Sequence, residues 1–255
     1  MASNGNCRCP YACCNTLAMP CRVCGEPNTV ESHLVPRALT RMVADKEQHT
    51  FLGSANRRGK IFDGKGTFDR NLLCTTHESQ LHTADTYGVE FLRSFHDKSS
   101  RCISDDRIWL TPNPDPQLLV RFVAACVWRR GMSPVRADNA DLHLGVREHR
   151  LTQFLFGSTN FEPQLIVTRQ ELLNLGVPLP GYVMFEPYRY LGWSVGSWNF
   201  TFGNCTMLLN LDYTRNRQRF EKVEANRANP ARSIILKEAE AVDAGWLAIL
   251  VAMNK

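Results

Sequence analysis

Four residues near the start of the chain have the types and the spacing of a zinc site. Cys21 and Cys24 form one pair with two residues between them, and Cys74 and His77 form a second pair with the same spacing. A structural zinc ion takes four sulfur or nitrogen donors in a tetrahedron, and each such pair can supply one edge of it. Because two matched pairs arise rarely by chance, we predict one structural Zn²⁺ ion bound by these four side chains. The alternative is a set of buried free thiols, with His77 capping a helix.

The chain holds ten cysteines in 255 residues, but it does not have the character of a disulfide framework. Such frameworks are typical of short secreted domains, whereas these cysteines crowd at the front of a long chain without an apolar signal core. Four of them lie in residues 1–18, for which we predict a flexible tail: Cys7, Cys9, Cys13 and Cys14. A second zinc cluster from these thiols stays an alternative, although their tight spacing leaves little chain to surround a tetrahedral ion.

Short regular elements are predicted on both sides of the ligand pairs. Val30–Val35 is an extended run, and Pro36 can begin a helix that continues to Val43, because its missing N–H is harmless at the first helical position. Thr75–Phe95 has apolar residues every three or four positions, which predicts an amphipathic helix that begins at the second ligand pair. Residues 45–68 are polar, and their basic side chains are the candidates for contacting phosphate: Arg57, Arg58, Lys60 and Lys65.

The second half of the chain has the pattern of a mixed domain of helices and antiparallel strands. Three prolines in residues 111–116 indicate a linker, because they cannot continue a helix. Periodic apolar residues then predict helices over 117–130 and 146–156. Later runs rich in aromatic and branched residues predict strands over 164–168, 182–190, 194–202 and 206–213.

These patterns favour the α+β class and a division into three parts. We predict a tail over residues 1–18, a zinc-binding module over 19–105 and a C-terminal α+β domain over 117–255. The formal net charge of +5 permits a nucleic-acid partner without requiring one. No apolar stretch reaches the roughly 18 to 20 residues that span a bilayer, so we expect an intracellular protein without membrane contact.

Three motifs in the first half together resemble the zinc-containing HNH endonucleases. They are the Cys-x-x-Cys-Gly motif that begins at Cys21, Glu31-Ser-His-Leu-Val-Pro36, and Asn71-Leu-Leu-Cys-x-x-His77. Two later segments, Arg121–Trp128 and Tyr188–Phe202, look like the second domain of some bacterial and phage HNH-like proteins. The resemblance implies an N-terminal ββα-metal module in which the zinc is structural. It also implies a separate catalytic Mg²⁺ or Mn²⁺ ion for phosphodiester cleavage.

The resemblance assigns roles to individual side chains as well. His33 matches the position of the general base that activates water, and Asp69 or Asn71 matches the polar residue that orients this base. Glu78, directly after the last zinc ligand, matches a position that binds the catalytic metal. His82, one helical turn later, offers a further donor to that metal, although a solvated helix histidine is the simpler interpretation.

Ser32 departs from the family pattern, because many HNH members have Asp or His directly before the general base. A hydroxyl is a poor ligand for a divalent metal. Glu31 could replace it only if the strand is bulged, since neighbouring residues on a strand face opposite sides. His33 has an alternative too, because a histidine beside a zinc site can serve only to hydrogen-bond a backbone carbonyl.

The sequence thus leads to two functional hypotheses. The first is an HNH-type, metal-dependent endonuclease that hydrolyses phosphodiester bonds of DNA, with structural Zn²⁺ and catalytic Mg²⁺ or Mn²⁺. The alternative is a non-catalytic zinc module that binds nucleic acid or protein within a phage or defence assembly. DNA is the expected partner, and the C-terminal domain is the candidate for homo-oligomerisation or assembly. The expected location is the cytoplasm of a bacterium or of a phage-infected cell.

Overall fold

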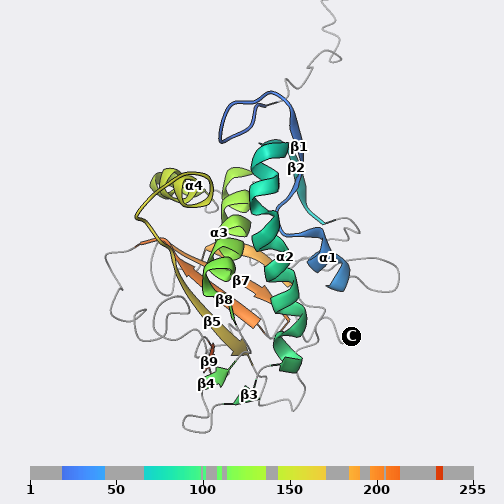
Figure 1. Cartoon of the computed structure of the whole chain (residues 1–255), viewed down its shortest axis with the longest axis vertical. Helices are drawn as coiled ribbons and strands as arrows, with labels where there is room; N and C mark the ends of the chain where they lie inside the picture. Colours follow the sequence, from blue (N-terminus) through green and yellow to red (C-terminus); the bar gives the residue numbers. More distant parts are fainter. Residues whose placement is uncertain are drawn as a thin grey trace, which may run out of the picture.

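Figure 1 shows a computed structural model of the whole chain. The structure describes residues 19–43, 66–98, 100–101, 108–110, 114–135, 143–170, 184–189, 196–203, 205–212 and 234–237. The described part is a mixed α+β fold with a small and a large sheet. Two groups of predicted functional residues lie outside it, namely the basic residues Arg57, Arg58, Lys60 and Lys65 and the cysteines Cys7, Cys9, Cys13 and Cys14.

A two-stranded antiparallel sheet followed by a long helix forms the N-terminal part. Strand β1 (Thr29–His33) pairs with β2 (Phe68–Cys74), and these two strands together are called the hairpin sheet. Helix α2 (Thr75–Lys98) begins at the residue directly after β2. The short helix α1 (Arg37–Val43) follows Pro36, whose ring already has the φ angle of a helix.

Seven strands form the larger sheet. They are β3 (Ser100–Arg101), β4 (Ile108–Leu110), β5 (Gln164–Gln170), β6 (Met184–Arg189), β7 (Ser197–Phe202), β8 (Cys205–Asn210) and β9 (Ile234–Lys237). Their order across the sheet is β3-β4-β9-β5-β8-β7-β6. The β5–β9 pair is parallel and the other pairs are antiparallel.

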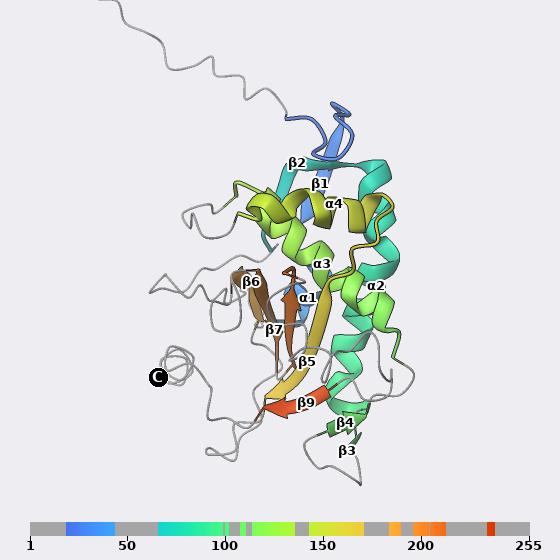
Figure 2. The same ribbon diagram turned by 90° about the vertical axis from the view of Figure 1, so that its left-hand side faces the viewer.

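Two helices pack side by side and cover one face of the larger sheet (Figure 2). Helix α3 (Pro116–Met132) begins after Asp115, whose carboxylate accepts a hydrogen bond from the Leu118 N–H at 3.0 Å. Helix α2 lies close against α3 at Gly88, where an added Cβ would lie 2.2 Å from Cγ of Phe122. The two helices can therefore come this close only because position 88 has no side chain.

Helix α4 (Glu148–Phe156) follows a single 3₁₀ turn, η2 (Gly145–Arg147), and packs against α3. The guanidinium of Arg121, on α3, donates a hydrogen bond to the carbonyl of Phe154 at 3.3 Å. Because the last carbonyls of a helix have no partner within the helix, this bond both caps α4 and fixes it to α3.

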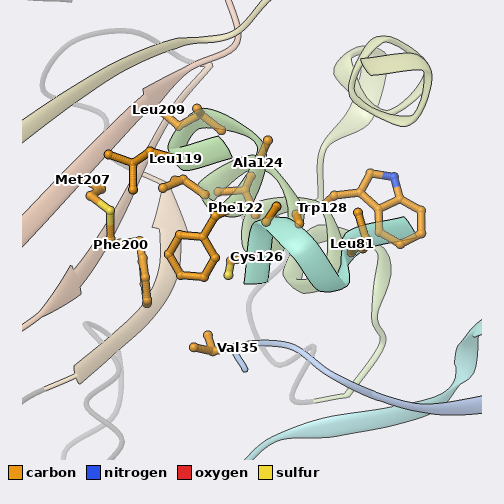
Figure 3. Packing of buried hydrophobic residues seen from close by; sticks show 14 of the residues in the cluster. Val35, Leu81, Leu119, Phe122, Ala124, Cys126, Trp128, Phe200, Met207 and Leu209 are labelled. Carbon is orange, nitrogen blue, oxygen red and sulfur yellow. The ribbon is translucent and has the colours of Figure 1, made fainter. Parts of the chain in front are cut away.

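Side chains from one face of β7 and β8 pack against α3 and form the core between this helix and the larger sheet. The rings of Phe122 and Phe200 meet with centroids 5.9 Å apart, and Met207 and Leu209 lie beside them in Figure 3. All residues of β7 and β8 are buried, so both faces of the sheet are covered at these strands. Most of the buried apolar residues form one cluster that runs from Cys21 to the strands of the larger sheet.

The structure confirms the α+β class and the longer predicted elements. The helices predicted over 75–95 and 117–130 correspond to α2 and α3, and the four predicted strands correspond to β5, β6, β7 and β8. The helix predicted over 146–156 begins at Glu148, because its first turn is 3₁₀. Strands β2, β3, β4 and β9 were not predicted from the residues, and β3 joins the larger sheet although it lies within 19–105.

Among the described helices, none is both long enough and apolar enough to cross a membrane.

Candidate metal centre and the surrounding side chains

The four predicted zinc ligands come together at one end of the hairpin sheet. Cys74 is the last residue of β2, His77 lies in the first turn of α2, and Cys21 and Cys24 lie in the turn before β1. One ligand atom from each residue can be chosen so that all four lie within 4.8 Å of one another. No second group of three or more His, Cys, Asp or Glu side chains in the described residues meets the same condition.

The individual distances match the edges of a tetrahedron around zinc. The Cys24 and Cys74 sulfurs are 3.9 Å apart, and His77 Nδ1 lies 3.7 Å from the Cys21 sulfur and 3.2 Å from the Cys74 sulfur. With Zn–S bonds of about 2.3 Å and Zn–N bonds of about 2.0 Å, the edges should be about 3.8 Å between sulfurs and about 3.5 Å between sulfur and nitrogen. The four side chains thus fit a closed Cys₃His zinc site, which has no open position for a substrate.

Backbone hydrogen bonds hold the first ligand pair in place. The Cys21 N–H donates to the Glu26 carbonyl at 2.8 Å, and the Gly25 N–H donates to the Cys21 carbonyl at 2.9 Å. Gly25 has a φ of 78°, which a residue with a side chain adopts only with strain. The Arg22 N–H donates to the Leu72 carbonyl at 3.0 Å, so the turn is bonded directly to β2.

The metal centre is partly shielded from solvent, and the pKa values of its first two thiols shift in opposite directions, downward for Cys21 and upward for Cys24 beside the Cys21 and Cys74 sulfurs. Cys21 and Cys74 are buried, whereas Cys24 is exposed. Burial acts to raise the pKa of Cys21, but hydrogen bonds from the backbone of Cys24, Val23 and Cys74 lower it, and the net shift is downward. A thiol with a lowered pKa is more readily present as the thiolate that zinc requires.

An aromatic contact connects the metal centre to α4. The ring of Phe156 meets the His77 ring edge-on, with centroids 5.3 Å apart, and also meets Trp128 of α3 at 5.2 Å. The indole N–H of Trp128 donates to Thr152 Oγ1 at 2.8 Å. Because these contacts orient the rings, α3 and α4 support the position of the histidine ligand.

The inner face of the hairpin sheet is bonded to α2 and α3. Ser32 is fully buried, and its hydroxyl donates to Glu78 Oε2 at 2.8 Å. The other oxygen of Glu78 accepts a hydrogen bond from Arg129 at 3.2 Å. Arg129 also contacts both oxygens of Asp85, at 2.7 and 3.1 Å. Glu78 therefore already holds a cation, the guanidinium that α3 supplies.

Arg129 is only 1% exposed and nevertheless remains charged. Burial alone would lower its pKa, but the negative charges of Asp85 and Glu78 more than offset this and raise the pKa above its ordinary value. Ser32, Glu78, Asp85 and Arg129 thus form one bonded group, the Arg129 cluster.

The resemblance implies that Asp69 or Asn71 orients His33. In the structure, Asp69 instead contacts Ser133 and the backbone of Asn71. Asp69 pairs with Ser32 in the hairpin register and is buried. Its Oδ2 accepts a 2.6 Å hydrogen bond from the Ser133 hydroxyl, and its Oδ1 accepts a 2.8 Å bond from the Asn71 N–H. The carboxylate of Asp69 thus joins β2 to the end of α3, and Asn71 contributes its backbone to the same arrangement.

The outer face of the hairpin sheet carries His33, Glu31, Phe68 and Arg70. His33 pairs with Phe68 in the register, and their ring centroids lie 5.7 Å apart. Glu31 Oε2 lies 3.3 Å from Arg70, and Glu31 Oε1 lies 3.9 Å from His33 Nε2. The guanidinium carbon of Arg70 lies 5.6 Å from the centre of the Phe68 ring.

The pairing of β1 with β2 is irregular between Val30 and Ser32. One residue of β1 there lies opposite three residues of β2. An irregularity of this kind is the condition under which Glu31 could replace Ser32 as a metal ligand. Glu31 nevertheless contacts Arg70 and His33, and the partner of Glu78 on β1 is Ser32. His82 is exposed on α2.

Sequence reasoning missed three residues that organise the site, namely Asp85, Arg129 and Ser133. A signal for one of them was present, because Arg129 directly follows the apolar run Val123–Trp128 on a predicted helix. A charged residue in such a position is almost never fully buried unless it is paired. The identity of its partners, which lie 44 and 51 residues away, could not be deduced from the sequence.

Comparisons of the chain with protein-family models, curated proteins and solved structures gave no match.

Proposed function

We propose that the N-terminal part is an HNH-like module, held by one structural zinc ion, that binds DNA without cutting it. The observation that carries this proposal is the Arg129 cluster. In the HNH resemblance, position 32 and Glu78 are the places where the catalytic metal would be bound. Here Ser32 donates to Glu78 at 2.8 Å, and Arg129 contacts the second oxygen of the same carboxylate at 3.2 Å.

Electrostatics oppose a divalent ion at Glu78 while Arg129 is in place. Two unit charges 4 Å apart interact by about 4 kcal/mol at an effective dielectric constant of 20, and a divalent ion doubles that energy. Arg129 is buried and is held by Asp85 as well, so it cannot simply turn away into water. A Mg²⁺ or Mn²⁺ ion would thus have to displace a cation that is already bonded to three carboxylate oxygens.

Three features support DNA as the partner. The arrangement of two antiparallel strands followed by a helix, with a zinc ligand pair at the strand-to-helix junction, agrees with the HNH resemblance. Arg37 and Arg41 on α1 are exposed, and so is Arg70 on β2. Positively charged side chains of this kind contact the phosphates of DNA.

A paired binding and nicking experiment tests the proposal. Purified zinc-loaded protein and the His33→Ala variant are compared on supercoiled plasmid, with and without added Mg²⁺ or Mn²⁺. We expect DNA binding at low salt that does not depend on the added metal, and no more nicking by the natural protein than by the variant. Lack of DNA binding at low salt would contradict the proposal.

The second candidate function is the metal-dependent endonuclease, and the placement of His33 favours it. This histidine follows Ser32 on β1, and its side chain is 17% exposed on the outer face of a sheet that the zinc holds. A general base needs a fixed position of this kind, although the Nε2 atom of His33 is itself buried from solvent. Plasmid nicking that requires Mg²⁺ or Mn²⁺ and is lost in His33→Ala would establish this function in place of the first.

A further inference from the structure

The outer face of the hairpin sheet contains a carboxylate that is paired with an exposed arginine and lies near a histidine. Glu31 directs one oxygen to Arg70, at 3.3 Å, and the other to His33 Nε2, at 3.9 Å. Both partners come from the same sheet, because His33 lies two residues after Glu31 on β1 and Arg70 lies on β2. The Glu31 carboxylate thus marks a place where this surface accommodates an anion.

An aromatic ring supports both of these nitrogen-bearing side chains. Phe68 lies 5.7 Å from the His33 ring and 5.6 Å from the guanidinium carbon of Arg70. Contact with a ring restricts the motion of a guanidinium and leaves its N–H groups able to bond an anion. The Arg70 donor is therefore partly preorganised, although its side chain is 73% exposed.

The inner face of the hairpin sheet is engaged in contacts within the protein, so the outer face is the candidate surface for binding an anion. Ser32 and Asp69 are bonded to Glu78 and Ser133, so the inner face is occupied by contacts within the protein. On the outer face, Glu31 is 39% exposed, and ion pairs at such exposed positions are weak. An incoming anion can displace a carboxylate that is held so loosely.

We infer that Glu31 occupies the position of a DNA phosphate group, and that a phosphate displaces it from Arg70 when DNA binds. The inference rests on the proposed DNA binding and names the surface and the chemical group involved. Arg70 is then a phosphate contact, because a guanidinium can donate two parallel hydrogen bonds to phosphate oxygens as it does to a carboxylate. Glu31 acts as an internal competitor that weakens binding.

Fluorescence anisotropy with a labelled DNA duplex of mixed sequence, about two helical turns long, tests this inference. We expect Arg70→Gln to weaken binding about tenfold, because a charge-assisted contact is lost, and to reduce the slope of log K against log salt concentration by about 1. Glu31→Gln should strengthen binding by about two- to fivefold, because the competing carboxylate is removed. In the double variant, Glu31→Gln should have no effect, because Arg70 is absent.

Arg93→Gln is the matched control, because it removes the same charge from an exposed arginine. Arg93 lies on α2, 16 residues beyond His77, which corresponds to about 24 Å along a helix. We expect its effect on binding to stay below twofold. Equal effects of Arg70→Gln and Arg93→Gln, or Glu31→Gln binding no more tightly than the natural protein, would overturn the inference and leave the proposed DNA binding intact. No binding by the natural protein would overturn both.

A competition experiment distinguishes DNA phosphate from free phosphate as the ligand. Inorganic phosphate is added to the DNA complex, and sodium chloride of equal ionic strength serves as the reference. We expect both salts to weaken binding to the same degree, because a single phosphate ion gains none of the other contacts of DNA. Specific displacement by phosphate that disappears in Arg70→Gln would assign the site to the free anion instead.

Discussion

Replacing Arg129 by methionine tests whether this buried cation holds α2, α3 and the hairpin sheet together. Methionine is an unbranched side chain that can fill much of the same space without charge or donors. Arg129 is 1% exposed, and its partners Asp85 and Glu78 are 17% and 28% exposed, so solvent can only partly replace the lost contacts. Removing one member of a buried ion pair costs about 3 to 5 kcal/mol, because the remaining charge stays uncompensated. We expect a loss of this size in the free energy of unfolding.

Urea unfolding followed by tryptophan fluorescence measures the loss, and Trp128 is adjacent to Arg129 in the chain. The dependence of the free energy on urea concentration should stay the same, because the surface exposed on unfolding hardly changes. Arg93→Met is the control, and as a surface substitution it should change the free energy by less than about 0.5 kcal/mol.

A triple variant that removes all three charges of the Arg129 cluster tests whether the lost stability comes from uncompensated charge. Glu78→Gln and Asp85→Asn remove both negative charges, and combined with Arg129→Met they leave a neutral cluster in which the new amide at position 78 can still accept from Ser32. Neutral replacements of buried ion pairs are often tolerated, so much of the lost stability should return. If Arg129→Met lies within about 1 kcal/mol of the natural protein, or if the triple variant is no more stable than Arg129→Met, the cluster does not have the role assigned to it.

Three further predictions concern the zinc ion, the helix contact and alkaline pH. Metal analysis should find one tightly bound Zn²⁺ per chain, and Cys74→Ala should lose both the metal and the near-ultraviolet circular dichroism of the folded N-terminal part; a metal-free yet fully folded protein would contradict this. Gly88→Ala should lower the free energy of unfolding by at least about 1 to 3 kcal/mol, because its Cβ would lie 2.2 Å from Phe122, whereas Ser79→Ala on the exposed side of α2 should cost little; equal urea midpoints for the two variants would refute the packing argument. Burial raises the pKa of Tyr87, whose hydroxyl accepts from the Asp115 N–H at 2.6 Å, so its contribution to stability is present below about pH 10 and is lost as the pH rises through the raised pKa. As the pH rises above about 10, Tyr87→Phe should therefore lose less stability than the natural protein, and identical pH profiles would exclude this role.

Features that depend on local sequence could be predicted. The zinc ligands were found because each pair is defined by residue type and a spacing of three positions, and helices α2 and α3 were found from their apolar period. Strand alternation also places Ser32 and His33 on opposite faces of β1. The catalytic metal site was expected only from the resemblance, and Mg²⁺ or Mn²⁺ binding belongs to the second candidate function alone.

Features that depend on distant partners could not be predicted. Strand β9 pairs with β4, which lies far earlier in the chain, and both strands are too short for a periodic pattern. The sequence indicates that Arg129 forms an ion pair, but it does not identify the carboxylates that pair with it. The contact of Glu31 with Arg70 likewise depends on an irregular register between β1 and β2. In each case the missing information is tertiary pairing, which local propensity does not contain.

The zinc ion and Arg129 hold the hairpin sheet at different places and by different chemistry. The zinc ligands lie near the pair Thr29 and Cys74, whereas the bonds of Ser32 and Asp69 lie at the opposite end of the register. Helix α2 contributes to both places, because consecutive residues of its first turn have different partners. His77 belongs to the metal centre, and Glu78 bonds Ser32 in the Arg129 cluster. Since contacts among the described residues occupy the inner face and the metal end, the outer face around Arg70 is the part of this sheet that we propose as the surface for a partner.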